Sequence, residues 1–131
     1  MKDLARNKRE IAYLNYRGKE DVLDSDGFKT GEKQIAYTRP VKIKAHVSGA
    51  KGNSMVEVFG TDISYDKTIL LTKSEFTRSG INENSVFFID TPIAYLDGLP
   101  LYDYRVKRIA DTPNQVLIAV EKVSASNENH A

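Results

Sequence analysis

The feature that most constrains the fold of this chain is an alternation of apolar and polar residues with a period of two. It is clearest over residues 34–48, where two sets alternate strictly: Val41, Ile43, Ala45 and Val47 against Lys42, Lys44, His46 and Ser48. Successive side chains of a β-strand point to opposite faces of the sheet, so this spacing predicts a strand whose apolar set is buried in the core. Pro40 interrupts the run and indicates a bend or an edge position.

Similar stretches recur along the chain and predict further strands, at residues 9–16, 55–59, 61–72, 86–90, 102–110 and 115–123. In the fifth of these, strict alternation places Val106 and Ile109 on opposite faces. The connections are long and polar, and only residues 2–9 could begin with a helical turn. We therefore expect an all-β fold, a small β-barrel or sandwich of about six strands with long polar loops.

The expected domain organisation is simple. A flexible N-terminal arm (1–8) precedes one β-barrel domain (9–123), and a tail (124–131) of polar composition is expected to be disordered. A chain of 131 residues is long enough to build its own core without disulfides or metal.

Composition narrows the function classes. The chain has no cysteine, which excludes disulfides, zinc thiolate sites and cysteine nucleophiles and fits a reducing compartment. Its formal charge of +1 provides no overall field for nucleic acid or an acidic membrane. The N-terminus carries charges where a signal peptide needs apolar residues, and no apolar run reaches membrane-spanning length. We expect an intracellular protein without a membrane partner.

The stretch 56–71, VEVFGTDISYDKTILL, holds the most crowded polar side chains. Asp62 and Asp66 would share the polar face of an extended strand, four residues apart, with backbones roughly 13 Å from each other. Catalytic carboxylate pairs of glycosidases lie about 5–9.5 Å apart, so these two residues make a poor dyad. We interpret the stretch as a strand with one core face, carrying Ile69 and Leu71, and one solvent face, carrying Thr68 and Leu70.

Other motifs that carry chemistry are also weak. Aligning residues 22–33 with a calcium-binding loop places Val22 and Lys33 where carboxylate ligands are required, so a turn is the better interpretation. His46 and His130 have no partner motif, and no glycine-rich phosphate loop is present. The sequence therefore predicts no catalytic, cofactor or metal site, and a protein that is not an enzyme.

The distribution of charge along the chain indicates self-association. The segment up to Lys19 is basic, while residues 90–103 carry Asp90, Asp97 and Asp103 without a basic residue. Unlike patches of this kind suit self-association. The candidate subunit-interface residues are Asp62, Asp66, Lys42 and Lys44. An alternative remains open, a monomeric β-barrel that binds nucleic acid or an oligosaccharide, although the strand with the two lysines has no aromatic residue for base stacking.

The order of elements also resembles a known family. An early strand is followed by LDSDGFKTGE (23–32), YTRPVKIKAHVS (37–48) and VEVFGTDISYDKTI (56–69), and later by SVFFID, YDYRVKRIA and VLIAVEKV. This series resembles the head-closure, or stopper, proteins of the head–tail connector of long-tailed bacteriophages, which are related to head–tail adaptor and joining barrels. The resemblance runs from about Lys8 to Val123 and is most specific over residues 57–69.

The resemblance implies a structural, homo-oligomeric role. Such proteins form a twelve-subunit ring in the virion neck, assembled in the host cytoplasm, with portal and adaptor proteins above and tail terminator or other tail proteins below. The ring closes the DNA-filled head, retains the packaged DNA through non-specific contact in the channel, and provides the docking surface for the tail. The polar loops 48–54, 73–84 and 91–101 are the candidates for the segment that lines this channel.

Overall fold

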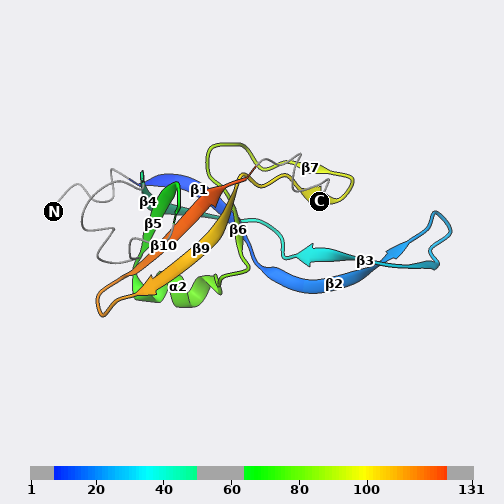
Figure 1. The fold of residues 1–131 in the computed structure, drawn as a ribbon, viewed down its shortest axis with the longest axis horizontal. Coiled ribbons are helices and arrows are strands. Elements are labelled where there is room, and N and C mark those ends of the chain that lie inside the picture. Colours follow the sequence, from blue (N-terminus) through cyan, green and yellow to red (C-terminus); the bar gives the residue numbers. More distant parts are fainter. Residues whose placement is uncertain (1–7, 50–63, 124–131) are drawn as a thin grey trace.

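A computed structural model describes residues 8–49 and 64–123 of the chain. Six antiparallel strands close into a barrel in the order β1-β4-β5-β10-β9-β6, so the prediction of a small all-β barrel is confirmed (Figure 1). The barrel strands are β1 (Arg9–Leu14), β4 (Val41–Gly49), β5 (Lys67–Leu71), β6 (Val86–Phe88), β9 (Tyr104–Asp111) and β10 (Val116–Lys122).

The interior of the barrel is filled by side chains from all six strands. β10 is the most completely buried, with five consecutive buried residues, Val116 to Val120. The main cluster consists of Ile11, Tyr13, Ala45, Ile69, Leu71, Ile81, Phe87, Ile89, Tyr104, Val106, Val116, Ile118 and Val120. A second cluster on the outer side of β1 and β6 contains Ala12, Leu14, Val86 and Phe88. The alternation read in residues 9–14 therefore separates two apolar faces, both of which are covered.

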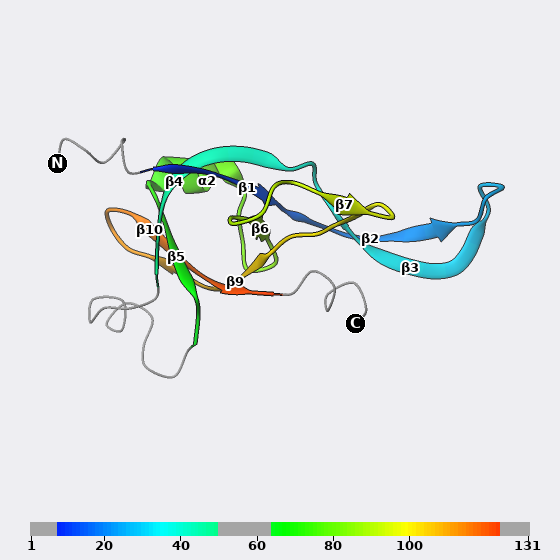
Figure 2. The same ribbon diagram turned by 90° about the horizontal axis from the view of Figure 1, so that it is seen from above.

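A long hairpin projects from this barrel. Its strands are β2 (Tyr16–Leu23) and β3 (Lys29–Tyr37), which pair only with each other. β2 follows β1, and β3 leads into β4, so residues 9–49 form one long ribbon in which the paired strands β1 and β4 lie in the barrel wall. Figures 1 and 2 both show the other end of the ribbon, β2 with β3, extending away from the barrel along the long axis. We call this hairpin, residues 16–37, the arm.

Two predicted loops contain regular structure. Residues 73–84 include the helix α2 (Lys73–Ser79), and residues 91–101 include the short hairpin of β7 (Tyr95–Leu96) and β8 (Leu99–Pro100). The expectation of a polar loop without a helix after residue 72 was therefore wrong. The helix begins with a capping box in which Thr72 and Glu75 each bond the backbone N–H of the other, and it ends at Gly80 with φ of 72°. Phe76 packs against the barrel core.

Strict alternation also failed at two places in the barrel. In β9 the register against β10 slips by one residue, because Ala119 pairs with Arg108 but Val120 pairs with Val106. The unpaired Lys107 forms a β-bulge, which brings Ile109 to the same inner face as Val106. In β5, Thr68 is buried and Leu70 packs with Leu117 and Ala119, so the face interpreted as exposed is partly covered.

The inward set of β4 is only partly buried. Ala45 is fully buried, and Ile43 and Val47 are half-buried against the core, but the expectation for Val41 was wrong because its side chain is 43% exposed. Val41 is the first residue of β4, where the ribbon leaves the barrel wall. The exposed valine lines a groove that is described below.

Candidate functional site

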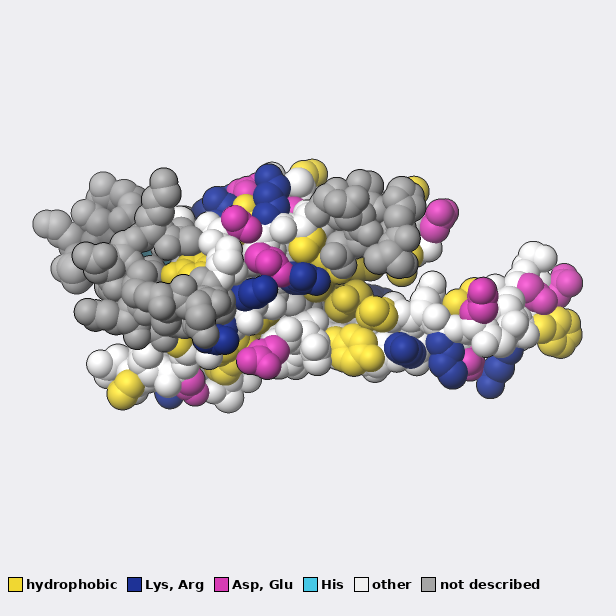
Figure 3. Space-filling view, in the orientation of Figure 1, with side chains coloured by type: hydrophobic (Ala, Val, Ile, Leu, Met, Phe, Trp, Pro, Cys, Tyr) yellow, Lys and Arg dark blue, Asp and Glu magenta, His cyan; other side chains and the backbone are white. Residues whose placement is uncertain are grey.

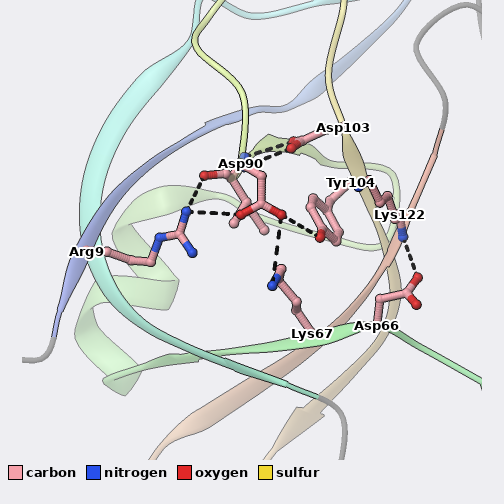
Figure 4. A network of polar contacts seen from close by, with 8 residues as sticks. Arg9, Asp66, Lys67, Asp90, Asp103, Tyr104 and Lys122 are labelled. Atoms are coloured by element: carbon pink, nitrogen blue, oxygen red, sulfur yellow. Dashed lines mark hydrogen bonds and ion pairs between the residues drawn. The ribbon is translucent and has the colours of Figure 1, made fainter.

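A network of polar contacts lies at the rim of the barrel, around Asp90 (Figure 4). Asp90 follows β6, and three residues from the beginnings of other strands point toward its carboxylate. The Tyr104 hydroxyl donates a hydrogen bond to Oδ2 at 2.8 Å, and Arg9 donates to Oδ1 at 3.1 Å. Lys67 Nζ lies 3.9 Å from Oδ2 and 5.9 Å from the centroid of the Tyr104 ring.

A second carboxylate fixes the backbone of the same segment. Asp103 is buried, and its two oxygens accept the backbone N–H groups of Ile89 and Asp90, both at 2.8 Å. Arg9 also donates to the Ile89 carbonyl at 2.6 Å. These bonds replace a β-ladder at a point where β6 has already ended, so the network joins strand ends from β1, β5, β6 and β9.

The network shifts the pKa values of two of its side chains, Asp90 and Tyr104. Burial raises the pKa of Asp90, but the Tyr104 hydroxyl, Arg9 and Lys67 outweigh it, so the pKa of this carboxyl is lowered overall. Burial, and then the hydrogen bond to Asp90, raise the pKa of Tyr104 well above its ordinary value. Asp90 is therefore held as a carboxylate whose oxygens are engaged, and Tyr104 is held as a neutral phenol.

This arrangement suits structural support better than catalysis. A general base needs a carboxylate or imidazole that faces a substrate, and a tyrosine nucleophile needs a lowered pKa. Here both groups are directed at each other. In the described ranges, no three His, Cys, Asp or Glu side chains are arranged to hold a metal ion.

The candidate interface residues are placed differently from one another. Asp62 lies outside the described residues. Asp66 is exposed just before β5, and its Oδ2 accepts the backbone N–H of Lys122 at 2.7 Å, which ties β5 to the end of β10. Lys42 and Lys44 are exposed on β4, and within residues 8–49 and 64–123 neither forms an ion pair. The structure does not bring Asp66 and the two lysines together within one chain.

The acidic patch expected over residues 90–103 does not form one surface. Asp103 is buried and Asp90 is compensated by Arg9 and Lys67, so only Asp97 of the three is exposed without such a partner among the described residues. Sequence spacing could not reveal this, because the compensating cations come from strands far away in the chain.

The sequence predicted only the ends of the arm, residue 16 and residues 34–37, as strand. The Asp–Gly turn was recognised, and Asp24 indeed organises it, since its Oδ1 accepts the N–H groups of Asp26 and Phe28. Residues 17–23 and 29–33 were not predicted as strands, because a hairpin without a core face has no apolar alternation. The available signal was the pairing of polar runs around a strong turn.

A groove opens beside α2 at the barrel wall. It has a volume of about 570 Å³ and an apolar lining of Tyr13, Val41, Ile43 and Leu71. Charged residues of the N-terminal segment, of β4 and of α2 surround this lining: Lys8, Lys44, Glu75 and Arg78.

Three tyrosines stand where the arm leaves the barrel. The rings of Tyr16, Tyr37 and Tyr102 meet edge to face, with centroids 6.4 Å and 6.0 Å apart. Tyr37 and Tyr102 also pack against the outer apolar cluster of β1 and β6. In the face shown by Figure 3, hydrophobic side chains gather at this junction. The tyrosines therefore brace the arm against the barrel.

Comparison with protein-family models, with curated proteins and with solved structures found no match to this chain. The described part of the chain contains no helix that is long and apolar enough to cross a membrane.

Proposed function

We propose that this protein is a non-enzymatic structural subunit of the head–tail connector of a long-tailed bacteriophage. Its subunits form a ring, twelve in the family it resembles, that closes the DNA-filled head, retains the DNA and receives the tail. Portal or adaptor proteins lie above this ring, tail proteins below it and packaged DNA within it. The location is the virion neck, after assembly in the host cytoplasm.

One observation carries this proposal, the braced arm on a closed barrel. The barrel has no unpaired barrel edge and buries its own core, so it needs no partner for stability. Yet the arm presents large apolar side chains to solvent, with Phe28 70% and Leu23 56% exposed. Exposed apolar side chains on an ordered projection are expected of a subunit that contacts other subunits. The engaged carboxylates around Asp90 support a role without catalysis.

The proposal is tested by genetic depletion in a phage that encodes this chain. We expect depletion to produce heads without attached tails, either filled with DNA or emptied after packaging, as seen by electron microscopy. Adding the purified protein to such freshly packaged heads should protect the DNA from nuclease. Normal infectious virions from depleted cells would contradict the proposal.

The alternative of a monomeric binding module retains one supporting observation. A groove of about 390 Å³ beside the arm is lined by Tyr37 and Tyr102 together with Arg105 and Lys107. Aromatic and basic side chains are combined in this way in proteins that bind single-stranded nucleic acid. However, both cations are paired with Glu121, and both tyrosines are packed at the arm junction. Fluorescence anisotropy with labelled oligonucleotides and oligosaccharides distinguishes the two, because the structural role predicts no saturable binding to the monomer.

A further inference from the structure

The tip of the arm combines apolar exposure with negative charge. Phe28, the most exposed large apolar residue of the described chain, stands beside the turn, and Leu23 stands on the other strand of the tip. Asp24 and Asp26 lie between them. Figure 3 shows apolar and acidic side chains together at the far end of the arm. Because Asp24 accepts the N–H of Phe28 at 3.0 Å, the turn that carries this ring is ordered.

The groove beside α2 has the complementary character. Its lining is apolar and includes Val41, whose exposed side chain has no cover among the described residues. Its rim carries three cations, Lys8, Lys44 and Arg78, against the single carboxylate of Glu75. That carboxylate is occupied, because it accepts the Thr72 N–H at 2.9 Å and lies 3.8 Å from Lys8. The rim is therefore positive. The volume of the groove falls within the range of ligand pockets.

An arm cannot fill the groove of its own chain. β2 has eight residues, which at about 3.3 Å per residue reach roughly 26 Å. Figures 1 and 2 show this reach directed away from the barrel and from α2. A contact between tip and groove must then join two chains. Because tip and groove are different surfaces, the contact can be repeated from copy to copy, and it builds a ring where the rotation between copies closes.

We propose that the arm tip of one copy inserts Phe28 into the groove between α2 and β4 of a second copy. The apolar lining receives the ring, and Asp24 and Asp26 face the cations of the rim. This inference rests on the proposed ring-forming function and names the contact that builds the ring. It assigns Lys44 to the groove side of that contact, with the acidic partner on the arm.

Disulfide trapping tests the contact directly, because the chain has no cysteine of its own. The double variant Ser25→Cys/Lys44→Cys places one thiol on the tip and one on the groove rim. Oxidation should give a ladder of dimers, trimers and larger species, whereas a mixture of the two single variants should stop at dimers. The matched control is Ser25→Cys/Asn114→Cys, since Asn114 is exposed in the turn between β9 and β10. A ladder of equal strength in the control would overturn the proposal.

Sedimentation measurements test the energetics. Phe28→Ala should weaken self-association roughly 10- to 100-fold, the loss typical of a buried aromatic anchor. Leu96→Ala, at a residue that is 56% exposed on the β7–β8 hairpin, should leave self-association unchanged. Asp26→Lys and Lys44→Glu should each weaken association, and the two together should restore part of it. An unchanged association of Phe28→Ala would overturn the contact.

Two further outcomes separate this inference from the proposed function. Rings that form normally from Phe28→Ala, or a trapping ladder that appears only after deletion of residues 1–7, would overturn the arm contact and leave the ring function in place. The second result would identify the N-terminal residues as the occupant of the groove. Conversely, virions that form without this protein would remove the connector role, while a positive trapping result would still establish the contact between copies.

Discussion

Asn15 shows how single side chains hold this fold where the β-ladders end. It lies between β1 and the arm, and its Nδ2 donates to the Ser79 carbonyl at 2.9 Å while its Oδ1 accepts from the Ser85 hydroxyl at 2.7 Å. Its backbone N–H donates to Thr38 Oγ1 at 3.0 Å. One residue thus connects the base of the arm, the end of α2 and the approach to β6.

Replacing Asn15 with Ala should destabilise the protein by about 1–3 kcal/mol, because the Ser79 carbonyl and the Ser85 hydroxyl lose their partner in a half-buried position. Urea denaturation measures this loss. Asn114→Ala, in an exposed turn, is the control and should stay within about 0.5 kcal/mol. Equal midpoints for the two variants would show that water replaces both bonds at no cost.

The Asp90 network predicts a pH dependence with a definite sign. The lowered pKa of Asp90 contributes stability that is fully present above the unfolded value of about 3.9 and is lost as the pH falls through the folded value. Tyr104→Phe removes one bond that lowers this pKa, so the Asp90 pKa should rise and the acid loss of stability should become less steep. Carboxyl NMR titration checks the shift, and an unchanged pKa would exclude the hydroxyl as a cause.

At the scale of elements, α2 depends on its ends because it has only seven residues. Thr72→Ala removes the side chain that accepts the Glu75 N–H at 3.1 Å and should cost about 1 kcal/mol. Thr77→Ala, at an exposed position inside the same helix, is the matched control and should be neutral or slightly stabilising. Thermal unfolding distinguishes them. A cost as large for Thr77 would mean that the loss at position 72 does not report on the cap, because helix propensity alone favours alanine at both positions.

The arm is an element that the barrel does not need for folding. Lys19 and Ile35 face each other in the ladder, so residues 20–34 can be replaced by Asn-Gly, which joins the pair through a two-residue turn. The shortened chain should keep the circular dichroism spectrum of a folded barrel and unfold cooperatively, and it should lose self-association. A shortened chain that fails to fold would show that the arm contributes to the barrel core.

At the scale of the whole molecule, assembly should depend on the exposed lysines of β4. Lys42→Asp/Lys44→Asp should block ring or connector assembly, because like charges placed across an interface cost more than a lost rim pair. The monomer should remain folded, since both positions are exposed. Lys42→Ala/Lys44→Ala separates the loss of cations from the added repulsion and should have the milder effect. Normal assembly of the aspartate variant, measured by sedimentation and by virion yield, would remove these residues from the interface.

The structure also changes which acidic residues can lie opposite these lysines. Asp66 was expected to offer a free carboxylate, but it accepts the Lys122 N–H, so Asp66→Lys would disturb β5 and β10 as well as an interface. The acidic residues of the arm tip are better suited to charge reversal. Asp26 in particular has its carboxylate exposed in the turn.

The sequence by itself determined the class of fold, because the period-two pattern is local to each strand. Residues 9–14, 41–49, 86–88 and 116–122 each carry enough apolar side chains to be recognised without their neighbours. The Asp24–Gly27 turn was also readable, since its chemistry lies within five residues. The capping box of Thr72 and Glu75 was equally local, and it was a signal that could have identified α2.

Only the tertiary structure decided which strands are neighbours, and with them the geometry of every candidate site. β1 pairs with β4 and β6, so Arg9 reaches Asp90, eighty-one residues away, and the apparent acidic patch disappears. The bulge at Lys107 turns Ile109 inward because it shifts the register of β9 against β10 by one residue. The arm projects because its two strands pair only with each other. This depends on which strands close the barrel, and the residues of the arm itself, 16–37, do not determine that closure.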